Sequence, residues 1–290
     1  MNYDVLLPVA AGTTADPTWA AAFARQVEEC GFDGIVAVEH SVVMRDYDSV
    51  YPYDASGRME LPVDCDVPDP LDLLAFLAAH TERVALATGV LVLPNHHPVV
   101  LAKRAATVDV LSKGRLRLCV GMGWMREEIE ACGADFATRG RRADEQIEVL
   151  RALWESGPDG ADHDGEFFAF TGAASFPKPA HRIPIHLGGH SAAAAKRAGR
   201  LGDGIQPLGV TGADLQQLIA TMRAEAERVG RDPEALELVL GHLVTRIDAD
   251  RAASLQRLGA SRVVLAPSAT PDLEQAKDEL SACAQRLGLS

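Results

Sequence analysis

The sequence has 290 residues, of which 47% are hydrophobic and 24% are charged, and this fits one α/β barrel of about 250 residues with a full core. Its formal net charge is −13 and no basic tail or stripe offsets it, which argues against nucleic acid or an anionic membrane surface as a partner. No hydrophobic stretch approaches the roughly 18 residues of a membrane span, so we expect no membrane segment.

Short β-rich runs alternate with helical patterns from one end of the chain to the other. Most of the runs are continuously hydrophobic, which is typical of parallel strands that are covered on both faces. In chain order, the predicted strands are residues 3–9, 34–39, 84–93, 116–121, 183–187, 204–207, 236–244 and 262–266. The predicted helices are residues 18–30, 70–80, 98–111, 139–155, 191–201, 213–229, 248–258 and 272–287.

This alternation predicts an α/β fold, a (β/α)8 TIM barrel with one domain over residues 1–290. The alternative is an open doubly wound sheet, which would need a diagnostic phosphate loop that we do not find. Two long irregular segments, about 41–69 and 156–182, are interpreted as insertions in the loops of the C-terminal face, where active sites of this fold lie. Tyr47, Tyr51 and Tyr53 in the first segment would wall a pocket there, unless the segment is only a solvated insertion.

The predicted strand ends are rich in glycine and contain few catalytic acids or bases. Side chains at these ends line the site of a barrel enzyme. The ends are Glu39-His40, Thr88-Gly89-Val90, Gly121-Met122-Gly123-Trp124, Gly188-Gly189-His190-Ser191 and Gln206-Pro207. Glycine inside a strand costs stability unless something must approach the backbone. The pattern favours a site that holds a large flat ligand against backbone over a site built for hydrolysis.

Residue placement argues against several other chemistries. No lysine ends a strand, which makes a Schiff-base aldolase improbable. The end of the first strand, Pro8-Val-Ala10, supplies no metal ligand, and His186 and His190 need not converge, so we expect no metal site. Gly121-Met-Gly123 is not a dinucleotide fingerprint, because its third position is Arg126 rather than glycine.

The turn from Gly188 to Ser191 joins a predicted strand to a predicted helix. Free backbone N–H groups at a helix N-terminus suit a phosphate, although Ser191 would also cap the helix without any ligand. Arg139, Arg141 and Arg142 lie at another helix start, where the helix dipole disfavours positive charge. Anion binding would explain these arginines, and so would a solvated basic patch.

The cysteines and the N-terminal residues point to a compartment. The five cysteines are widely spread and include no C-x-x-C pair, so neither a disulfide framework nor a zinc knuckle is indicated. The first residues have neither the basic region nor the hydrophobic run of a signal peptide. We therefore expect a reduced, cytoplasmic protein.

Taken in order, these motifs resemble the luciferase-like monooxygenase superfamily, and within it the oxidoreductases that use the deazaflavin coenzyme F420. The resemblance covers nearly the whole chain. It is carried by residues 38–40, 87–98, 103–115, 120–128, 165–168, 185–191 and 201–204. It implies a (β/α)8 barrel that binds FMN or the deazaflavin at its C-terminal mouth.

The resemblance also implies particular site residues. Many family members have a non-prolyl cis peptide bond at the end of the third strand, and here that bond would join Gly89 and Val90, with a plain bulge as the alternative. His40 would be catalytic and would neighbour the cofactor, with a structural histidine as the alternative. The other implied cofactor-binding residues are Thr88, Gly89, Val90, Gly121, Met122, Gly123, Trp124, Gly188, Gly189, His190, Ser191 and Arg141, the last with help from Arg142.

One departure from the family pattern concerns the proton donor. Some deazaflavin enzymes place a glutamate directly after the fourth strand, where this chain has Met122-Gly-Trp124. We expect Glu127 and Glu128 to start a helix, and His96 and His97 to be structural.

The implied function is that of an F420-dependent oxidoreductase, which transfers a hydride between the deazaflavin and a small organic substrate. A homodimer is the family expectation. The alternatives are an FMN-dependent monooxygenase on the same scaffold and a non-catalytic relative that binds a flavin.

Overall fold

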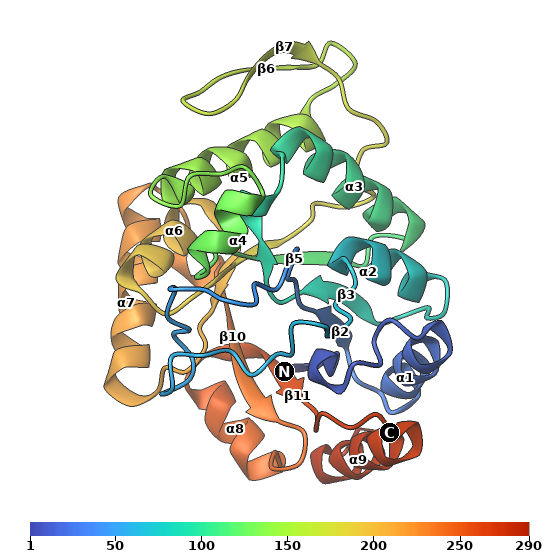
Figure 1. The fold of residues 1–290 in the computed structure, drawn as a ribbon. Coiled ribbons are helices and arrows are strands. Elements are labelled where there is room, and N and C mark those ends of the chain that lie inside the picture. The colour runs from blue at the N-terminus through green and yellow to red at the C-terminus, as the bar shows by residue number, and fades with distance from the viewer. Residues whose placement is uncertain (290) are drawn as a thin grey trace.

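Parallel strands close into a barrel in the computed structural model, which describes residues 1–289 (Figure 1). The strands are β1 (Asn2–Leu6), β2 (Gly34–Ala37), β3 (Ala85–Thr88), β4 (Leu91–Val92), β5 (Leu116–Gly121), β8 (Ile185–Gly188), β9 (Gly204–Gln206), β10 (Glu237–Leu243) and β11 (Ala260–Ala266). Their order is β3-β2-β1-β11-β10-β9-β8-β5-β4, and pairing of β3 with β5 closes the circle. β3 and β4 both lie within the predicted strand 84–93, so these strands occupy the eight predicted positions. The predicted barrel is confirmed.

Helices cover the outside of the barrel (Figure 1). They are α1 (Pro17–Glu29), α2 (Pro70–Ala78), α3 (Pro98–Leu111), α4 (Arg126–Ala131), α5 (Arg139–Glu155), α6 (Ala192–Leu201), α7 (Gly212–Arg228), α8 (Ala249–Arg257) and α9 (Leu273–Leu287). Asp16 and Asp69 cap α1 and α2, and a proline follows each, as expected of helix starts. The eight predicted helices are confirmed, and α4 is an additional one that is too short to show a helical period. No helix within residues 1–289 is both long and hydrophobic enough to cross a membrane.

The main hydrophobic core lies between the strands and the helices, where side chains such as Phe23, Leu74 and Ile147 are buried. A smaller hydrophobic layer lies inside the barrel and consists of Val36, Ala87, Val239 and Val264, with Leu6 against it. These inward-facing side chains alternate along their strands with residues of the main core, as expected of a barrel.

Charged side chains fill the barrel near the starts of its strands. Asp4 pairs with Arg262, and Glu237 pairs with Arg117. His186 Nε2 lies 2.9 Å from Glu237 Oε2. This charged cluster was not predicted, because the strands that carry it read as hydrophobic runs.

Glu237 is expected to make the stability of the barrel depend on acid pH. Its pKa is lowered from 4.5 to about 2, mainly by the hydrogen bond from His186 and further by the charge of Arg117. A carboxylate with a lowered folded-state pKa stabilises the fold above its unfolded pKa, and this contribution is lost as the pH falls towards the folded value. We therefore expect the free energy of unfolding to fall from about pH 4.5 towards pH 2.

Urea titrations at several pH values in that range measure this effect. The Glu237→Gln variant is expected to lose this part of the pH dependence, whereas Glu148→Gln, at an exposed position of α5, should retain it. Identical pH dependence in the wild type and the Glu237→Gln variant would contradict the assignment.

Residues 41–69 form no helix or strand, as predicted. The segment leaves the end of β2 and returns to α2, so it belongs to the C-terminal face of the barrel. Figure 1 shows it, in blue to cyan, passing in front of the barrel strands.

The prediction for residues 156–182 is wrong in two respects. The segment contains an antiparallel hairpin of β6 (Ala161–Asp164) and β7 (Ala169–Ala173), and it joins the end of α5 to β8 rather than extending a loop of the C-terminal face. The hairpin projects from the outside of the barrel (Figure 1). Glu145 of α5 holds it by accepting hydrogen bonds from the N–H groups of Phe167 and Phe168. Its strands were missed because β6 consists mostly of polar residues.

Candidate active site

A floor of small residues lies where β3, β5 and β8 end. The peptide bond between Gly89 and Val90 is cis, as expected. The Val90 side chain lies against two glycines, since a Cβ added to Gly121 would come within 2.7 Å of Val90 Cγ2 and one added to Gly188 within 2.5 Å of Val90 Cγ1. Gly89, Val90, Gly121 and Gly188 are called the glycine floor below.

The predicted residue Thr88 supports this floor from the side. Its hydroxyl donates to Cys119 O at 2.8 Å and accepts from Cys119 N at 2.9 Å, so it joins β3 to β5 beside the kink. Thr88 is fully buried. Its side chain therefore has a structural use and presents no free hydroxyl to a ligand.

Met122 and Gly123 shape the turn that leaves the floor. Gly123 has a φ of 74° and packs so closely that a Cβ would come within 2.7 Å of Ile129 Cδ1 and 2.9 Å of Val92 Cγ1. Glycine is the residue that tolerates both conditions. Met122 is partly buried and packs against the main core. This tight turn brings α4 against the strand ends.

His40 and Glu128 form a hydrogen-bonded pair beside the mouth. His40 Nδ1 lies 3.0 Å from Glu128 Oε2, and the N–H of Ser41 donates to Glu128 Oε1 at 2.7 Å. The Glu128 side chain is 3% exposed and that of His40 is 14% exposed, so the pair is shielded yet reachable. A carboxylate on Nδ1 makes that nitrogen the donor and leaves Nε2 as an acceptor in the neutral ring. Within residues 1–289, Nε2 of His40 has no hydrogen-bond partner.

A second buried pair holds the chain after the kink. Glu39 Oε1 lies 2.7 Å from His96 Nε2, and its other oxygen accepts from the N–H of Val92. His96 is therefore engaged in joining β2 to the segment after β4, in agreement with the structural role that we expected. His97 is exposed and touches the ring of Phe168 edge-on.

Glu127 and Glu128 lie in the first turn of α4, as expected, and both also bind the segment that follows β2. Glu127 accepts from the N–H of Asp48 at 2.8 Å and from the hydroxyl of Ser49 at 2.7 Å. One turn of a six-residue helix thus anchors both the His40 end and the aromatic part of segment 41–69. These anchoring roles were missed, because nothing in the local sequence distinguishes them from a helix start.

A row of aromatic rings runs from the end of β5 to the turn after β8. Trp124 meets Tyr47 at 5.5 Å and Tyr51 at 5.0 Å between ring centroids. Tyr51 meets Tyr53 at 5.4 Å, and Tyr53 meets His190 at 5.4 Å. All four contacts are edge-to-face, which is a favoured geometry for aromatic pairs. We call Tyr47, Trp124, Tyr51, Tyr53 and His190 the aromatic row.

Tyr53 joins Tyr51 to His190 in this row, and the residue is 38% exposed. Burial of part of the ring raises the pKa of its phenol, with smaller contributions from Tyr51 and Cys119. With a raised pKa, the phenol stays protonated at neutral pH and retains a hydrogen-bond donor.

The turn after β8 presents the start of α6 to the mouth. Ser191 caps the helix by accepting from the N–H of Ala194 at 3.2 Å, which is the alternative that we had left open for this residue. Gly189 has a φ of 122°. His190 and Ser191 are exposed, and the first turn of α6 carries no acidic residue, so the helix start is open to an anion.

Arg141 and Arg142 face the hairpin instead of this turn. Arg141 Nη1 lies 3.0 Å from Glu166 Oε1, and its side chain is 65% exposed. Arg142 lies over the ring of Phe168 at 4.6 Å. Their part in holding a phosphate stays a prediction.

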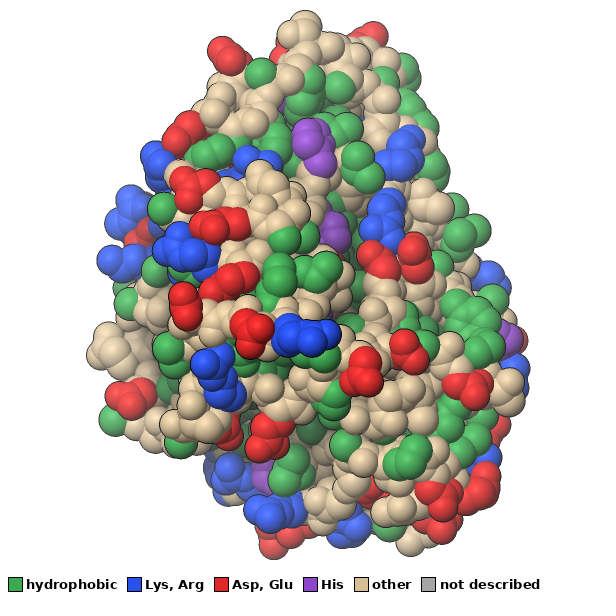
Figure 2. Space-filling model, viewed as in Figure 1, with side chains coloured by type: hydrophobic (Ala, Val, Ile, Leu, Met, Phe, Trp, Pro, Cys, Tyr) green, Lys and Arg blue, Asp and Glu red, His purple; other side chains and the backbone are tan. Residues whose placement is uncertain are grey.

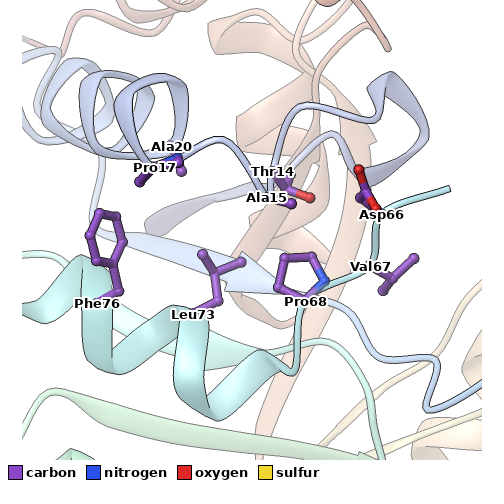
Figure 3. A pocket seen from close by; sticks show the side chains of 9 residues that line it. All are labelled: Thr14, Ala15, Pro17, Ala20, Asp66, Val67, Pro68, Leu73 and Phe76. Atoms are coloured by element: carbon purple, nitrogen blue, oxygen red, sulfur yellow. The ribbon is translucent and has the colours of Figure 1, made fainter.

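Cavity volume alone does not identify the site. A cavity of about 350 Å³ lies between α1 and α2 and is mostly hydrophobic (Figure 3). Asp66 is the only ionisable side chain in the lining of this cavity, so the cavity brings no acid–base pair together. A cavity of about 20 Å³ lies inside the barrel among Val36, Thr88, Cys119 and Gln206 and is too small for a ring. A flat ligand would therefore lie at the strand ends, against the glycine floor.

The comparisons with known proteins agree on a family. A family model described as "Luciferase-like monooxygenase" matches residues 1–286. An uncharacterised protein of Mycobacterium bovis is 33% identical over 216 residues, which cover 74% of each chain. An "F420-dependent glucose-6-phosphate dehydrogenase" of Segniliparus rotundus is 29% identical over 220 residues, which cover 73% of this chain and 60% of that protein.

Solved structures show the same fold. The structure described as an "F420-dependent secondary alcohol dehydrogenase in complex with an F420-acetone adduct" matches with a TM-score of 0.77 and 17% identity. The match covers 99% of this chain and 98% of that chain. At this identity the likeness concerns the fold alone.

Proposed function

Because this chain belongs to the luciferase-like monooxygenase family, whose model matches residues 1–286, we propose that it is an F420-dependent oxidoreductase that transfers a hydride between the deazaflavin and a small organic substrate. The F420-dependent activity in the name of the Segniliparus rotundus relative supports the choice of cofactor. The observation that carries the proposal is that the His40–Glu128 pair follows β2, the strand paired with β3, at whose end the glycine floor begins.

The residues at the mouth fit a deazaflavin. Gly121 and Gly188 leave no room for a Cβ beside Val90, so the floor offers backbone and one small side chain to a flat ring. Gly188 also begins the turn that leads to Ser191 and α6. One ligand with a ring on the floor and a phosphate at this turn would use both features. Gly89, Val90, Gly121 and Gly188 would contact the ring, and Gly189 to Ser191 the phosphate.

The protein would supply orientation and a proton route, and the bound deazaflavin would accept or donate the hydride. Glu128 holds the proton of His40 on Nδ1 and would stabilise the charged imidazolium. Nε2 of His40 would then take the proton of a substrate hydroxyl, or return it to a carbonyl oxygen in the opposite direction. The carboxylate that some deazaflavin enzymes place directly after the fourth strand is replaced here by one that acts through His40.

The family description favours one alternative, an FMN-dependent monooxygenase on the same floor. An FMN enzyme would use molecular oxygen as a second substrate. A non-catalytic flavin-binding relative would bind either ring without turnover. The homodimer suggested by the resemblance also stays a prediction.

Separate titrations of the purified protein with the deazaflavin and with FMN test the proposal, with binding followed by quenching of cofactor fluorescence. Tight binding of the deazaflavin, together with its reduction by an alcohol, supports the proposed function. Binding of FMN alone, with oxygen consumption coupled to product formation, would select the monooxygenase. Binding without turnover across a broad panel of substrates would select the non-catalytic relative.

We expect the Gly188→Val variant to bind the cofactor about 10- to 100-fold more weakly, because overpacking costs about 1–3 kcal/mol. The added Cβ would come within 2.5 Å of Val90 Cγ1 and would push Val90 into the space of the ring. The same titrations measure the affinity. Gly157→Val is the matched control, since a Cβ at Gly157 meets nothing within 4 Å. An unchanged affinity in a folded Gly188→Val protein would show that the ring does not lie on the glycine floor.

A further inference from the structure

The aromatic row is attached to two of the strands that carry the glycine floor. Trp124 follows Gly121 by three positions, and His190 follows Gly188 by two, so these two rings are fixed beside the ends of β5 and β8. β5 and β8 are neighbours, with Cys119 opposite His186. Tyr51 and Tyr53 bridge the gap between Trp124 and His190 through edge-to-face contacts of 5.0–5.4 Å. The floor and the row are therefore held at the same end of the barrel.

The start of this row lies beside the proton-transfer pair. Glu128 holds His40, and the adjacent Glu127 holds Asp48 and Ser49. Tyr47 immediately precedes these two residues and contacts Trp124. A compound whose ring packs against the row would therefore have His40 nearby to exchange a proton with its hydroxyl or carbonyl group.

The row contains no lysine, arginine or carboxylate, and the nearby arginines are mostly engaged. The lysines lie elsewhere, at Lys103, Lys113, Lys178, Lys196 and Lys277. Arg58 lies over the ring of Tyr47 at 4.7 Å and donates to Tyr47 O at 2.8 Å. Arg126 pairs with Glu130 at 3.0 Å. Arg45 is the exposed arginine that remains in segment 41–69.

The wider face has no basic area that would attract an anion. On the face shown in Figure 2, acidic and basic side chains are interspersed, with hydrophobic side chains between them. A phosphorylated substrate needs cations that are free to pair with it. The surroundings of the row offer flat hydrophobic surfaces instead.

We propose that the substrate is a small uncharged aromatic alcohol, or the matching aldehyde or ketone, whose ring packs against Trp124, Tyr51 and Tyr53. This inference rests on the proposed function for its reaction. In the oxidative direction, the hydroxyl proton would pass to Nε2 of His40, the carbinol carbon would give up its hydrogen as a hydride to the bound deazaflavin, and the C–O bond would become a carbonyl. The two electrons and the two hydrogens are thus accounted for.

Isothermal titration calorimetry with protein loaded with reduced deazaflavin tests the substrate class, because an alcohol binds to that form without reacting. The probes are 1-phenylethanol, 1-cyclohexylethanol of similar size, and glucose 6-phosphate. We expect 1-phenylethanol to bind about 3- to 10-fold more tightly than 1-cyclohexylethanol, since aromatic pairs gain about 0.5–1.5 kcal/mol beyond buried area. Glucose 6-phosphate should not bind measurably.

Two variants assign the preference to the row. Tyr53→Leu keeps a hydrophobic side chain and is expected to lower the aromatic preference to about 1- to 2-fold, whereas Tyr53→Phe should retain it. Circular dichroism checks that both variants are folded. Equal affinity for the two alcohols in the wild type, or tighter binding of glucose 6-phosphate that Arg45→Leu abolishes, would overturn the inference.

The same titrations separate this inference from the proposed function. If the deazaflavin does not bind, the proposed function fails, and titrations of the cofactor-free protein still decide whether the row prefers aromatic compounds. If the deazaflavin binds and is reduced by aliphatic alcohols as readily as by aromatic ones, the proposed function stands and the inferred substrate class fails.

Discussion

Replacing His40 by Gln is expected to lower kcat for hydride transfer by about 10²- to 10⁴-fold, the usual contribution of a general acid–base group. Glutamine retains a polar side chain of similar length but cannot take a proton. The glycine floor is unchanged in this variant, so the affinity for the deazaflavin should change less than about threefold. Steady-state rates of cofactor reduction and fluorescence titrations measure the two quantities separately.

Glu128 provides an intermediate case. Glu128→Gln preserves a hydrogen bond to His40 but removes the negative charge that would stabilise the imidazolium, so kcat should fall less than in His40→Gln. An unchanged kcat in a folded Glu128→Gln protein would contradict this role of Glu128.

His97→Gln is the matched control for His40. His97 is exposed and contacts the ring of Phe168, away from the glycine floor, so its replacement should leave kcat within about twofold of the wild type. If His40→Gln retains the full rate in a folded protein that still binds the deazaflavin, His40 does not carry the proton and another donor must be sought.

Residues 87–98 show how far reasoning from the sequence reaches. The hydrophobic run predicted a strand, and Gly89 within it predicted a kink where the backbone is approached closely. The structure divides this run into β3 and β4 and has the cis bond between Gly89 and Val90. The strand and its interruption follow from local sequence, since burial selects the hydrophobic residues and the absence of a side chain selects the glycine. The cis bond was expected only from the family resemblance.

Contacts between distant segments were not predictable in the same way. Glu128 and His40 are 88 positions apart, and Glu128 looks locally like a residue that starts a helix. The β6–β7 hairpin was missed because its polar strands are stabilised by Glu145 of α5 rather than by their own hydrophobic pattern. Such roles depend on which side chains the barrel brings together.

The charged cluster inside the barrel leads to the largest expected change in stability. Asp4 and Arg262 pair there, with 2% and 10% of their side chains exposed. Arg262→Leu leaves the carboxylate of Asp4 buried without its partner, so we expect the free energy of unfolding to fall by about 3–5 kcal/mol. Urea unfolding at neutral pH measures the change. Arg246→Leu, at an exposed position, should change it by less than about 0.5 kcal/mol.

Two further measurements separate the loss of the ion pair from a simple packing defect. The Asp4→Leu/Arg262→Leu double variant should recover much of the stability, because it leaves no buried charge of this pair unpaired. Burial raises the pKa of Asp4, and the charge of Arg262 opposes that rise. Without Arg262 the folded state holds a proton on Asp4 more tightly than the unfolded chain does, so the Arg262→Leu protein should regain stability as the pH falls. If the loss of unfolding free energy in Arg262→Leu is the same at every pH and is larger still in the double variant, the fold requires the shape of the Arg262 side chain rather than its charge.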